Sequence, residues 1–276
     1  MRVKTRVNIS PEYGVDVRDI LNPFGLHPVV PPTYHISLYR DDERYTPLVK
    51  ELEKRKIKFD EFPVNMVFSK AEMSSAEYLY MRMAGYWGYP KPEDDFLNES
   101  YDTSRVCPHC GQGPSQVRPL LVGKPGKFGN RDIAALNWVF AWLVTDRLRK
   151  LVQDENLTGA EFWPLLYFKD RTEVEGISQL KVTNILPPMS PNAEFEVIRE
   201  NRPRKCSHLP RIFSSHQMRY LRKDLPSFKD FNLTDEYLGG GWFRLDRSTV
   251  VSSAVWRLFD RNKIKRVTFN PVILEM

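Results

Sequence analysis

The sequence has no long apolar run and very little cysteine. No stretch approaches the roughly 18 apolar residues that a membrane-spanning helix needs, and the basic start MRVKTRVNIS lacks the apolar core of a secretory signal. The chain has only three cysteines, two of them in a Cys-x-x-Cys, which favours a metal site in a reducing compartment over a disulfide framework. We therefore expect a cytoplasmic protein that does not enter a membrane.

The common catalytic motifs are also missing. The sequence contains neither a Gly-x-Ser-x-Gly elbow nor a His-Glu-x-x-His, and the glycine triplet 239–241 lacks the Lys-Ser/Thr that completes a phosphate-binding loop. The five histidines are scattered, and the acidic clusters lie in polar stretches where solvation explains them. We therefore expect a binding protein and not an enzyme.

The composition is that of a folded protein with an uneven charge. Apolar residues make up 41% of the chain and aromatic residues 12%, enough for a sizeable core. The net charge is +6, but from Asn201 to the end 15 Lys and Arg stand against 7 Asp and Glu. A solvated basic face is the commoner reason for such an excess; an acidic partner or nucleic acid is the alternative.

Two stretches of the chain align without a gap at a spacing of 107 residues, namely Val144–Leu166 and Val251–Ile273. In each, apolar residues recur at i, i+3 and i+4, as on one face of a helix, and a short β-prone run that stops at a proline follows. The two apolar triplets are Leu148, Leu151, Val152 and Val255, Leu258, Phe259. The pattern predicts an α+β fold of two halves that each end in a similar helix-strand unit.

Coarser patterns divide the chain into three sections: an N-terminal α+β region 1–100, a section 101–190 with the first helix-strand unit, and a basic section 191–276 with the second. We expect strands at Val3–Ile9, Tyr34–Tyr39 and Ile177–Leu186. We expect helices from Thr46 to about Lys56, and from Ser69 to Met83, where Ser69 and Glu72 have the spacing of a capping box.

The most specific local motif is Cys-Pro-His-Cys-Gly at 107–111. Two thiolates at this spacing chelate one metal ion, and structural zinc requires four ligands. Cys107, Cys110, Cys206 and His208 would make such a set, with His216 as a substitute fourth ligand. All four are protein ligands, which leaves no open position for catalysis and predicts a structural zinc that joins the two halves. Unmetallated thiols in a turn, or a redox pair, are the alternatives.

Two stretches are candidate partner-binding surfaces, since aromatic residues and Arg dominate the energetics of interfaces. The first is the aromatic loop with Tyr86, Trp87 and Tyr89. The second is a basic stretch, in which the relevant residues are Arg202, Arg204, Lys205 and Arg211. The basic stretch also suits nucleic acid, because Arg219, Arg222 and Lys223 follow it and Phe213 and Tyr220 are available for stacking on bases.

The order of the motifs resembles that of a known group of proteins. SKAEMSSAEYL, CPHCG, the unit ending LTGAEFWP and the closing VSSAVWRLF are similar to bacterial double-CXXCG proteins and to related immunity proteins of polymorphic toxin systems. The likeness covers about residues 65–276. Leu209 stands where the second CXXCG would place a cysteine, so His208 is the expected fourth zinc ligand. The resemblance implies a protein that neutralises a cognate toxin by occlusion.

Overall fold

A computed structural model describes residues 1–10, 16–27, 34–104, 106–107, 113–123, 128–197, 211–213, 217–237 and 247–276. The chain has a mixed α+β fold, mostly strands with a few short helices, which confirms the expected class. It forms two compact units, Met1–Glu72 and Met73–Met276, each with its own apolar core. No helix among the described residues has both the length and the apolar composition to cross a membrane.

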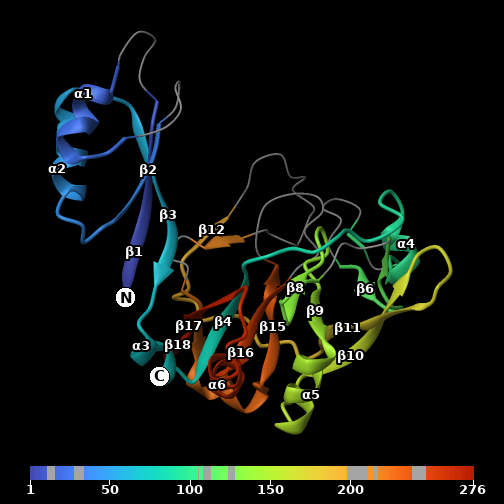
Figure 1. Cartoon of the computed structure of the whole chain (residues 1–276). Helices are drawn as coiled ribbons and strands as arrows, with labels where there is room; N and C mark the ends of the chain where they lie inside the picture. The colour runs from blue at the N-terminus through green and yellow to red at the C-terminus, as the bar shows by residue number, and fades with distance from the viewer. Residues whose placement is uncertain are drawn as a thin grey trace. The chain divides into compact units, whose positions relative to one another are not determined.

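The N-terminal unit is a three-stranded antiparallel sheet in the order β2-β1-β3. Its elements are β1 (Arg2–Ile9), α1 (Arg18–Leu21), η1 (Asn22–Phe24), β2 (Tyr34–Tyr39), α2 (Tyr45–Lys54) and β3 (Phe59–Val67). Alternate residues of β1 and β2 are buried against Leu48 and Leu52 of α2, and Figure 1 shows α1 and α2 beside this sheet. The predicted strands and helix are confirmed, although the residue at the N-cap of α2 is Arg44 and not Thr46.

The helix predicted from Ser69 to Met83 is wrong beyond its first turns. The capping box is present, because Ser69 N donates to Glu72 Oε2 over 2.7 Å and Glu72 N donates to Ser69 Oγ over 3.2 Å. The helix α3 (Lys70–Ser75) then ends, and β4 (Tyr78–Met83) is a strand. The reason is tertiary: β4 lies between two other strands, and burial of alternate side chains, Leu79 and Met81, suits a strand.

The C-terminal unit contains two larger sheets, one of five strands in the order β7-β10-β11-β9-β8 and one of four in the order β15-β16-β4-β17. Its helical elements are α4 (Phe96–Ser100), α5 (Asp146–Asp154), η2 (Arg222–Ser227) and α6 (Ser253–Arg261). Its further strands are β5 (Tyr101–Asp102), β6 (Ser115–Gln116), β7 (Leu121–Val122), β8 (Ile133–Ala135), β9 (Trp142–Thr145), β10 (Ala160–Tyr167), β11 (Glu173–Val182), β12 (Phe195–Val197), β13 (Arg211–Phe213), β14 (Arg219–Leu221), β15 (Phe231–Tyr237), β16 (Arg247–Ser252), β17 (Val267–Pro271) and β18 (Ile273–Glu275).

Both predicted helix-strand units are present, as α5 followed by β10 and as α6 followed by β17. The duplication extends further than the sequence indicates. In the first copy β11 pairs antiparallel with β9 and β10; in the second copy β4 pairs in the same way with β16 and β17. The registers correspond residue for residue, so that Phe162 lies opposite Leu180 and its counterpart Phe269 lies opposite Met81. The central strand of the first copy, β11, follows its helix-strand unit in the sequence, whereas the central strand of the second copy, β4, precedes its unit.

The two copies share one apolar core, to which both helices and the inner faces of both sheets contribute. In this core Trp142 Nε1 donates to Thr249 Oγ1 over 2.8 Å, and both groups are buried. These two residues are 107 positions apart and therefore correspond to each other in the alignment of the copies. The copies thus meet at equivalent residues. In the four-stranded sheet, β4 from the start of this unit pairs with β16 from near its end.

Candidate functional site

Four aromatic side chains of the C-terminal unit gather on its surface, and we refer to Tyr86, Tyr89, Trp138 and Phe140 as the aromatic patch. Tyr86, Tyr89 and Trp138 keep 47, 45 and 38% of their surface exposed, and Phe140 is half-buried. The rings pair edge to face, with centroids 5.9 Å apart for Tyr86 and Phe140 and 4.9 Å apart for Tyr89 and Trp138. Single exposed aromatic residues are ordinary, but a paired cluster of them is not.

The backbone holds the two parts of the aromatic patch together. The segment after β4 lies along β8, where Ala135 N donates to Gly85 O over 3.1 Å and Trp87 N donates to Ala135 O over 2.8 Å. Asn137 then donates to Gly88 O through its backbone N over 3.1 Å and through its side-chain Nδ2 over 3.0 Å. The rings therefore stand on tethered backbone, which lowers the entropy lost when a partner binds.

The turn between β8 and β9 carries backbone strain at both of its aromatic residues. Trp138 has a φ of 65° and Phe140 a φ of 47°, in a region that bulky side chains rarely adopt. A hydrogen bond from Leu136 N to Ala141 O, 2.9 Å long, closes the turn. Because asparagine or glycine would relieve the strain, large rings at these two positions point to a role in binding.

The sequence prediction for this surface is partly wrong. Tyr86 and Tyr89 are exposed as expected, but Trp87 is only 5% exposed and packs edge to face on Phe128 at 5.3 Å. The reason is that the segment runs extended along β8, so neighbouring side chains point to opposite sides and Trp87 enters the core. Sequence reasoning did not find Trp138 and Phe140. The signal for them is the run Asn-Trp-Val-Phe between two apolar stretches, since aromatic residues are unusual in a short turn.

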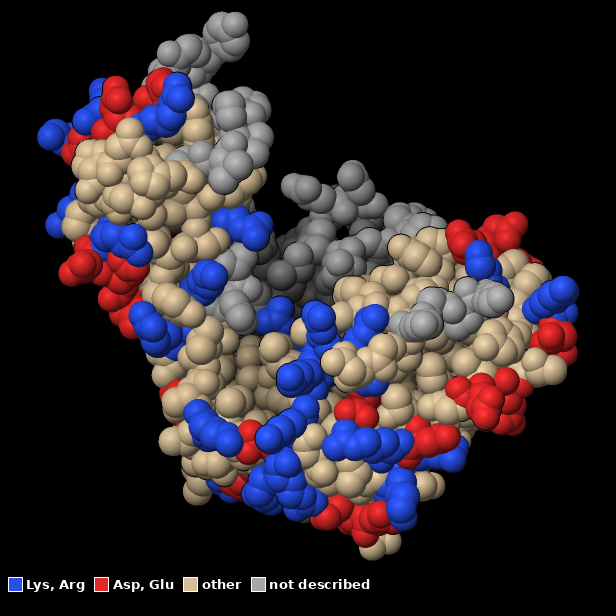
Figure 2. Space-filling model, in the orientation of Figure 1, with Lys and Arg blue, Asp and Glu red and all other residues tan. Residues whose placement is uncertain are grey.

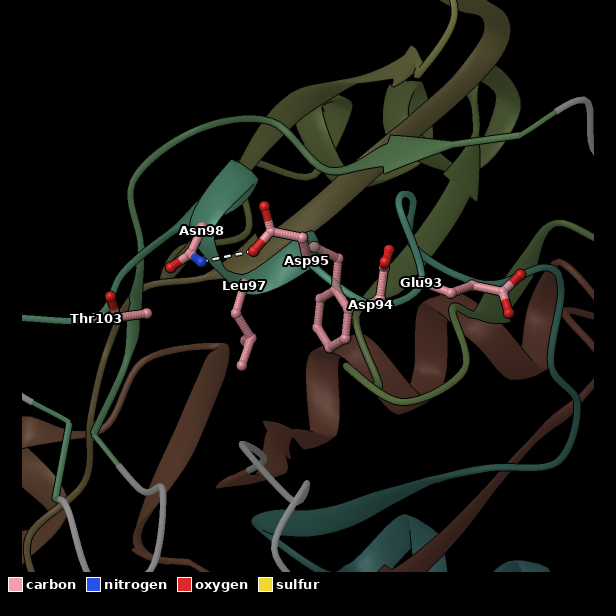
Figure 3. Close-up of a pocket in the computed structure, with 7 residues that line it drawn as sticks. Glu93, Asp94, Asp95, Leu97, Asn98 and Thr103 are labelled. Carbon is pink, nitrogen blue, oxygen red and sulfur yellow. Dashed lines mark hydrogen bonds between the residues drawn. The ribbon is translucent and has the colours of Figure 1, made fainter.

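A shallow pocket of about 380 Å³ borders the aromatic patch. The residues that line it are Glu93, Asp94, Asp95, Phe96, Leu97, Asn98 and Thr103, and the ring of Phe96 lies 6.0 Å from that of Trp138. Figure 3 shows that Glu93 extends away from Asp95, whose carboxylate accepts a hydrogen bond from Asn98 Nδ2 over 2.6 Å. The carboxyl groups do not converge on a common point, as acid–base catalysis or metal binding requires.

The zinc prediction concerns residues of which the structure describes only one. Cys107 is half-buried, while Cys110, Cys206 and His208, and the substitute His216, lie outside the described residues. Within the described ranges, no group of three or more His, Cys, Asp or Glu side chains could hold a metal ion. Three thiolates and one imidazole are a donor set that suits tetrahedral zinc, so the site stays a prediction.

The basic stretch lies mostly outside the described part of the chain. Arg202, Arg204 and Lys205 are not described, and of Arg211 only the backbone is, in β13 opposite Val197. Two of the arginines that follow form ion pairs. Arg219 lies 2.9 Å from Glu275 and Arg222 lies 2.5 Å from Glu77 in ion pairs. Tyr220 is completely buried and therefore cannot stack on a base.

Comparison with known proteins finds no matching family model and no matching curated sequence. The function must therefore be argued from the surface.

Proposed function

We propose that this protein binds another protein, without catalysis, and that the aromatic patch is the contact surface. The observation that carries the proposal is the pairing of exposed Tyr89 with Trp138, whose ring stands on strained backbone at a tethered turn. Tyr and Trp are the residue types that most often dominate binding energy, because they bury a large area and lose little side-chain entropy.

The surroundings of the aromatic patch favour binding over turnover. The carboxyl groups of the adjoining pocket do not form a converging acid–base pair (Figure 3), and Asp95 is engaged by its hydrogen bond from Asn98. A contact surface needs a defined shape that a partner can match and apolar groups from which water is removed on binding, and the tethered rings provide both. To block the active site of a partner, this chain needs such a contact surface and no catalytic groups of its own.

The partner that we propose is a toxin, and here the support is the resemblance to immunity proteins carried by CPHCG at 107–111 and by the two helix-strand units. In this proposal the protein acts in the cytoplasm, where it neutralises a toxin delivered by neighbouring or sister cells. A zinc held by Cys107, Cys110, Cys206 and His208 would serve as a structural staple, because metal binding at a four-ligand site stabilises the folded chain.

A survival assay tests the neutralisation proposal even while the toxin is unidentified. Cells that lack the gene are grown in contact with their parent strain and are complemented with the wild type or with Trp138→Asn. Asparagine removes the ring but tolerates the positive φ. We expect the deletion strain to be outcompeted, the wild type to rescue it, and Trp138→Asn to fail. Equal survival of the deletion strain would contradict the toxin assignment.

Nucleic-acid binding through the basic C-terminal quarter is the alternative function. The excess of Lys and Arg after Asn201 favours it, but the burial of Tyr220 and the ion pairs of Arg219 and Arg222 count against it. A nucleic acid that co-purifies and dissociates steeply with salt would favour this alternative.

A further inference from the structure

The turns that join helix to strand in the two copies have the same backbone but different residues. Asn156 and Lys263, which correspond, have φ values of 51° and 55°. Gly159 and Arg266 also correspond, with φ values of 86° and 71°. The hydrogen bonds that end the helices match as well: Leu157 N donates to Val152 O over 3.2 Å, and Ile264 N donates to Phe259 O over 2.9 Å.

Only the first copy has the residues that this backbone favours. Asparagine and glycine adopt a positive φ at little cost, whereas lysine and arginine adopt it with strain. The first copy reads Asn-Leu-Thr-Gly at 156–159, and the second reads Lys-Ile-Lys-Arg at 263–266. The second copy therefore has three basic residues where the first has none, and two of them are at strained positions. The apolar position, Leu157 or Ile264, is retained.

We refer to Lys263, Lys265 and Arg266 as the basic turn. All three side chains are exposed, and none of them forms an ion pair with another described residue. Arg82 of strand β4 lies opposite Thr268 of β17, and Thr268 is two residues after Arg266. In Figure 2 Lys and Arg side chains gather over the part of this face where Figure 1 places α6 and β4. The basic turn and Arg82 thus place cationic residues on neighbouring segments of the chain.

The basic turn adjoins the aromatic patch. Ala84 N donates to Arg266 O over 3.0 Å, and a Cβ at Gly85 would lie 3.7 Å from Arg266 Cδ, so the aliphatic stem of this arginine covers Gly85. The next residue is Tyr86, whose backbone O accepts a hydrogen bond from Arg131 Nη1 over 3.4 Å. Arg266 therefore lies beside the backbone segment that carries Tyr86.

We infer that the basic turn is the electrostatic part of the partner-binding surface, and that the partner is an acidic protein surface whose carboxylates lie beside an apolar contact for Tyr86 and Trp138. This inference rests on the proposed function. Exposed cations next to an apolar cluster complement Asp and Glu at the rim of an interface. The rings form two edge-to-face pairs, so each ring is packed against another ring and is not a separate stacking platform of the kind that single-stranded nucleic acid uses.

The first copy supplies the test variant. Lys263→Asn, Lys265→Thr and Arg266→Gly together give the basic turn the residues of 156–159, which removes three charges and relieves the strain at two positions. The variant should therefore fold at least as well as the wild type. A matched control, Lys50→Gln, Lys56→Gly and Lys58→Gln, removes three exposed charges from the N-terminal unit, including Lys56 with its φ of 56°.

Three fluorescent probes are compared by anisotropy: a peptide of Glu, Asp and Leu, the same peptide with Lys in place of its acidic residues, and a single-stranded oligodeoxynucleotide of equal charge to the acidic peptide. We expect the wild type and the control to bind the acidic peptide most tightly, and the turn variant to bind it roughly tenfold more weakly. Unchanged affinity in the turn variant, no preference for the acidic peptide, or tightest binding of the oligodeoxynucleotide would overturn the inference.

Trp138→Asn, measured with the same probes, separates this inference from the proposed function. If Trp138→Asn weakens binding of the acidic peptide and the turn variant does not, the aromatic patch is supported as the contact surface and the basic turn is rejected as its electrostatic part. If the turn variant weakens binding and Trp138→Asn does not, the charges act without the aromatic patch, and the proposed contact surface is wrong.

Discussion

Trp142 and Thr249 are joined by a buried hydrogen bond of 2.8 Å and occupy the same position in two copies of one structural unit. A contact between equivalent residues indicates that the copies pack as two subunits of a symmetric dimer do, here within one chain. Each helix covers only part of the shared core, so each helix-strand unit depends on the other to bury its apolar face. This arrangement also gives the strands and turns of each helix-strand unit an internal counterpart for comparison.

The hydrogen bond between the copies should contribute measurably to stability. Trp142→Phe and Thr249→Val each remove one partner, and because the other is left buried, each should lower the free energy of unfolding by about 1–3 kcal/mol. The double variant should reveal a coupling of about 1 kcal/mol. Urea unfolding of the four proteins gives this value. Fully additive losses would show that the bond does not link the copies energetically.

Gly159 is required by its close approach to the neighbouring strand. Its φ is 86°, and an added Cβ would lie 2.1 Å from Phe231 O, so Gly159→Ala should cost about 3 kcal/mol or more. Gly176 is the control, because its φ is 74° and no atom lies within 4 Å of the added Cβ. Gly176→Ala should cost only about 1 kcal/mol. Equal losses in urea unfolding would contradict the close approach.

The strained turn of the second copy should become more stable when it takes the residues of the first. Lys263→Asn and Arg266→Gly relieve φ values of 55° and 71°, and each should raise the free energy of unfolding by up to about 1 kcal/mol. Lys265→Thr, at a position without positive φ, should leave it unchanged. Thermal unfolding compares the three variants. A loss of stability in either of the first two would show that these side chains stabilise the fold.

Glu275 should make stability depend on pH. Hydrogen bonds from Ser190, Arg219 and Asn192 hold the pKa of its carboxyl below the usual value of 4.5. A lowered folded-state pKa stabilises the chain above the usual pKa, and this contribution is lost as the pH falls through the lowered value. Glu275→Gln should therefore be less stable at neutral pH, with a difference that shrinks in acid.

Unfolding of both proteins between neutral pH and pH values below 4.5 measures this difference, and Glu173→Gln, at an exposed strand position, is the control. The comparison with this exposed substitution separates the loss of the Glu275 hydrogen bonds from the general effect of removing one negative charge. A difference between the wild type and Glu275→Gln that does not change with pH would contradict the assignment.

The zinc prediction can be tested on the purified chain. Cys107→Ser should release the metal and lower the melting temperature, because a lost ligand leaves the remaining ones unable to hold zinc tightly. Elemental analysis and thermal unfolding of both proteins provide the measurement, and a serine substituted at an exposed position, Lys58→Ser, serves as the control. A wild type without bound zinc, together with an unchanged melting temperature in Cys107→Ser, would contradict the prediction.

Local patterns predicted the duplicated helix-strand units and two of the three strands of the N-terminal unit, β1 and β2, because apolar spacing and capping residues act within a few positions. They failed at Tyr78–Met83. This segment follows a capping box, but it forms a central strand because it pairs with β16 on one side and with β17 on the other. No local signal reveals that the central strand of the second copy comes from far upstream in the chain.

The candidate site was also only partly predicted, because part of it depends on strand pairing between segments that are distant in the sequence. Tyr86 and Tyr89 belong to a visible aromatic run, whereas Trp138 and Phe140 reach them only through the pairing of β8 with the segment after β4. The burial of Trp87 follows from the same pairing. The basic turn is recognisable only by comparison with the φ values of its counterpart, Asn156 to Gly159.

The most direct measurement is a pull-down from the native lysate with the wild type and with Trp138→Asn, washed at low and at high salt and analysed for protein and for nucleic acid. We predict that the wild type retains one protein partner at high salt and that Trp138→Asn does not. Equal retention by both proteins, or capture of nucleic acid alone that is released by salt, would contradict protein binding through the aromatic patch.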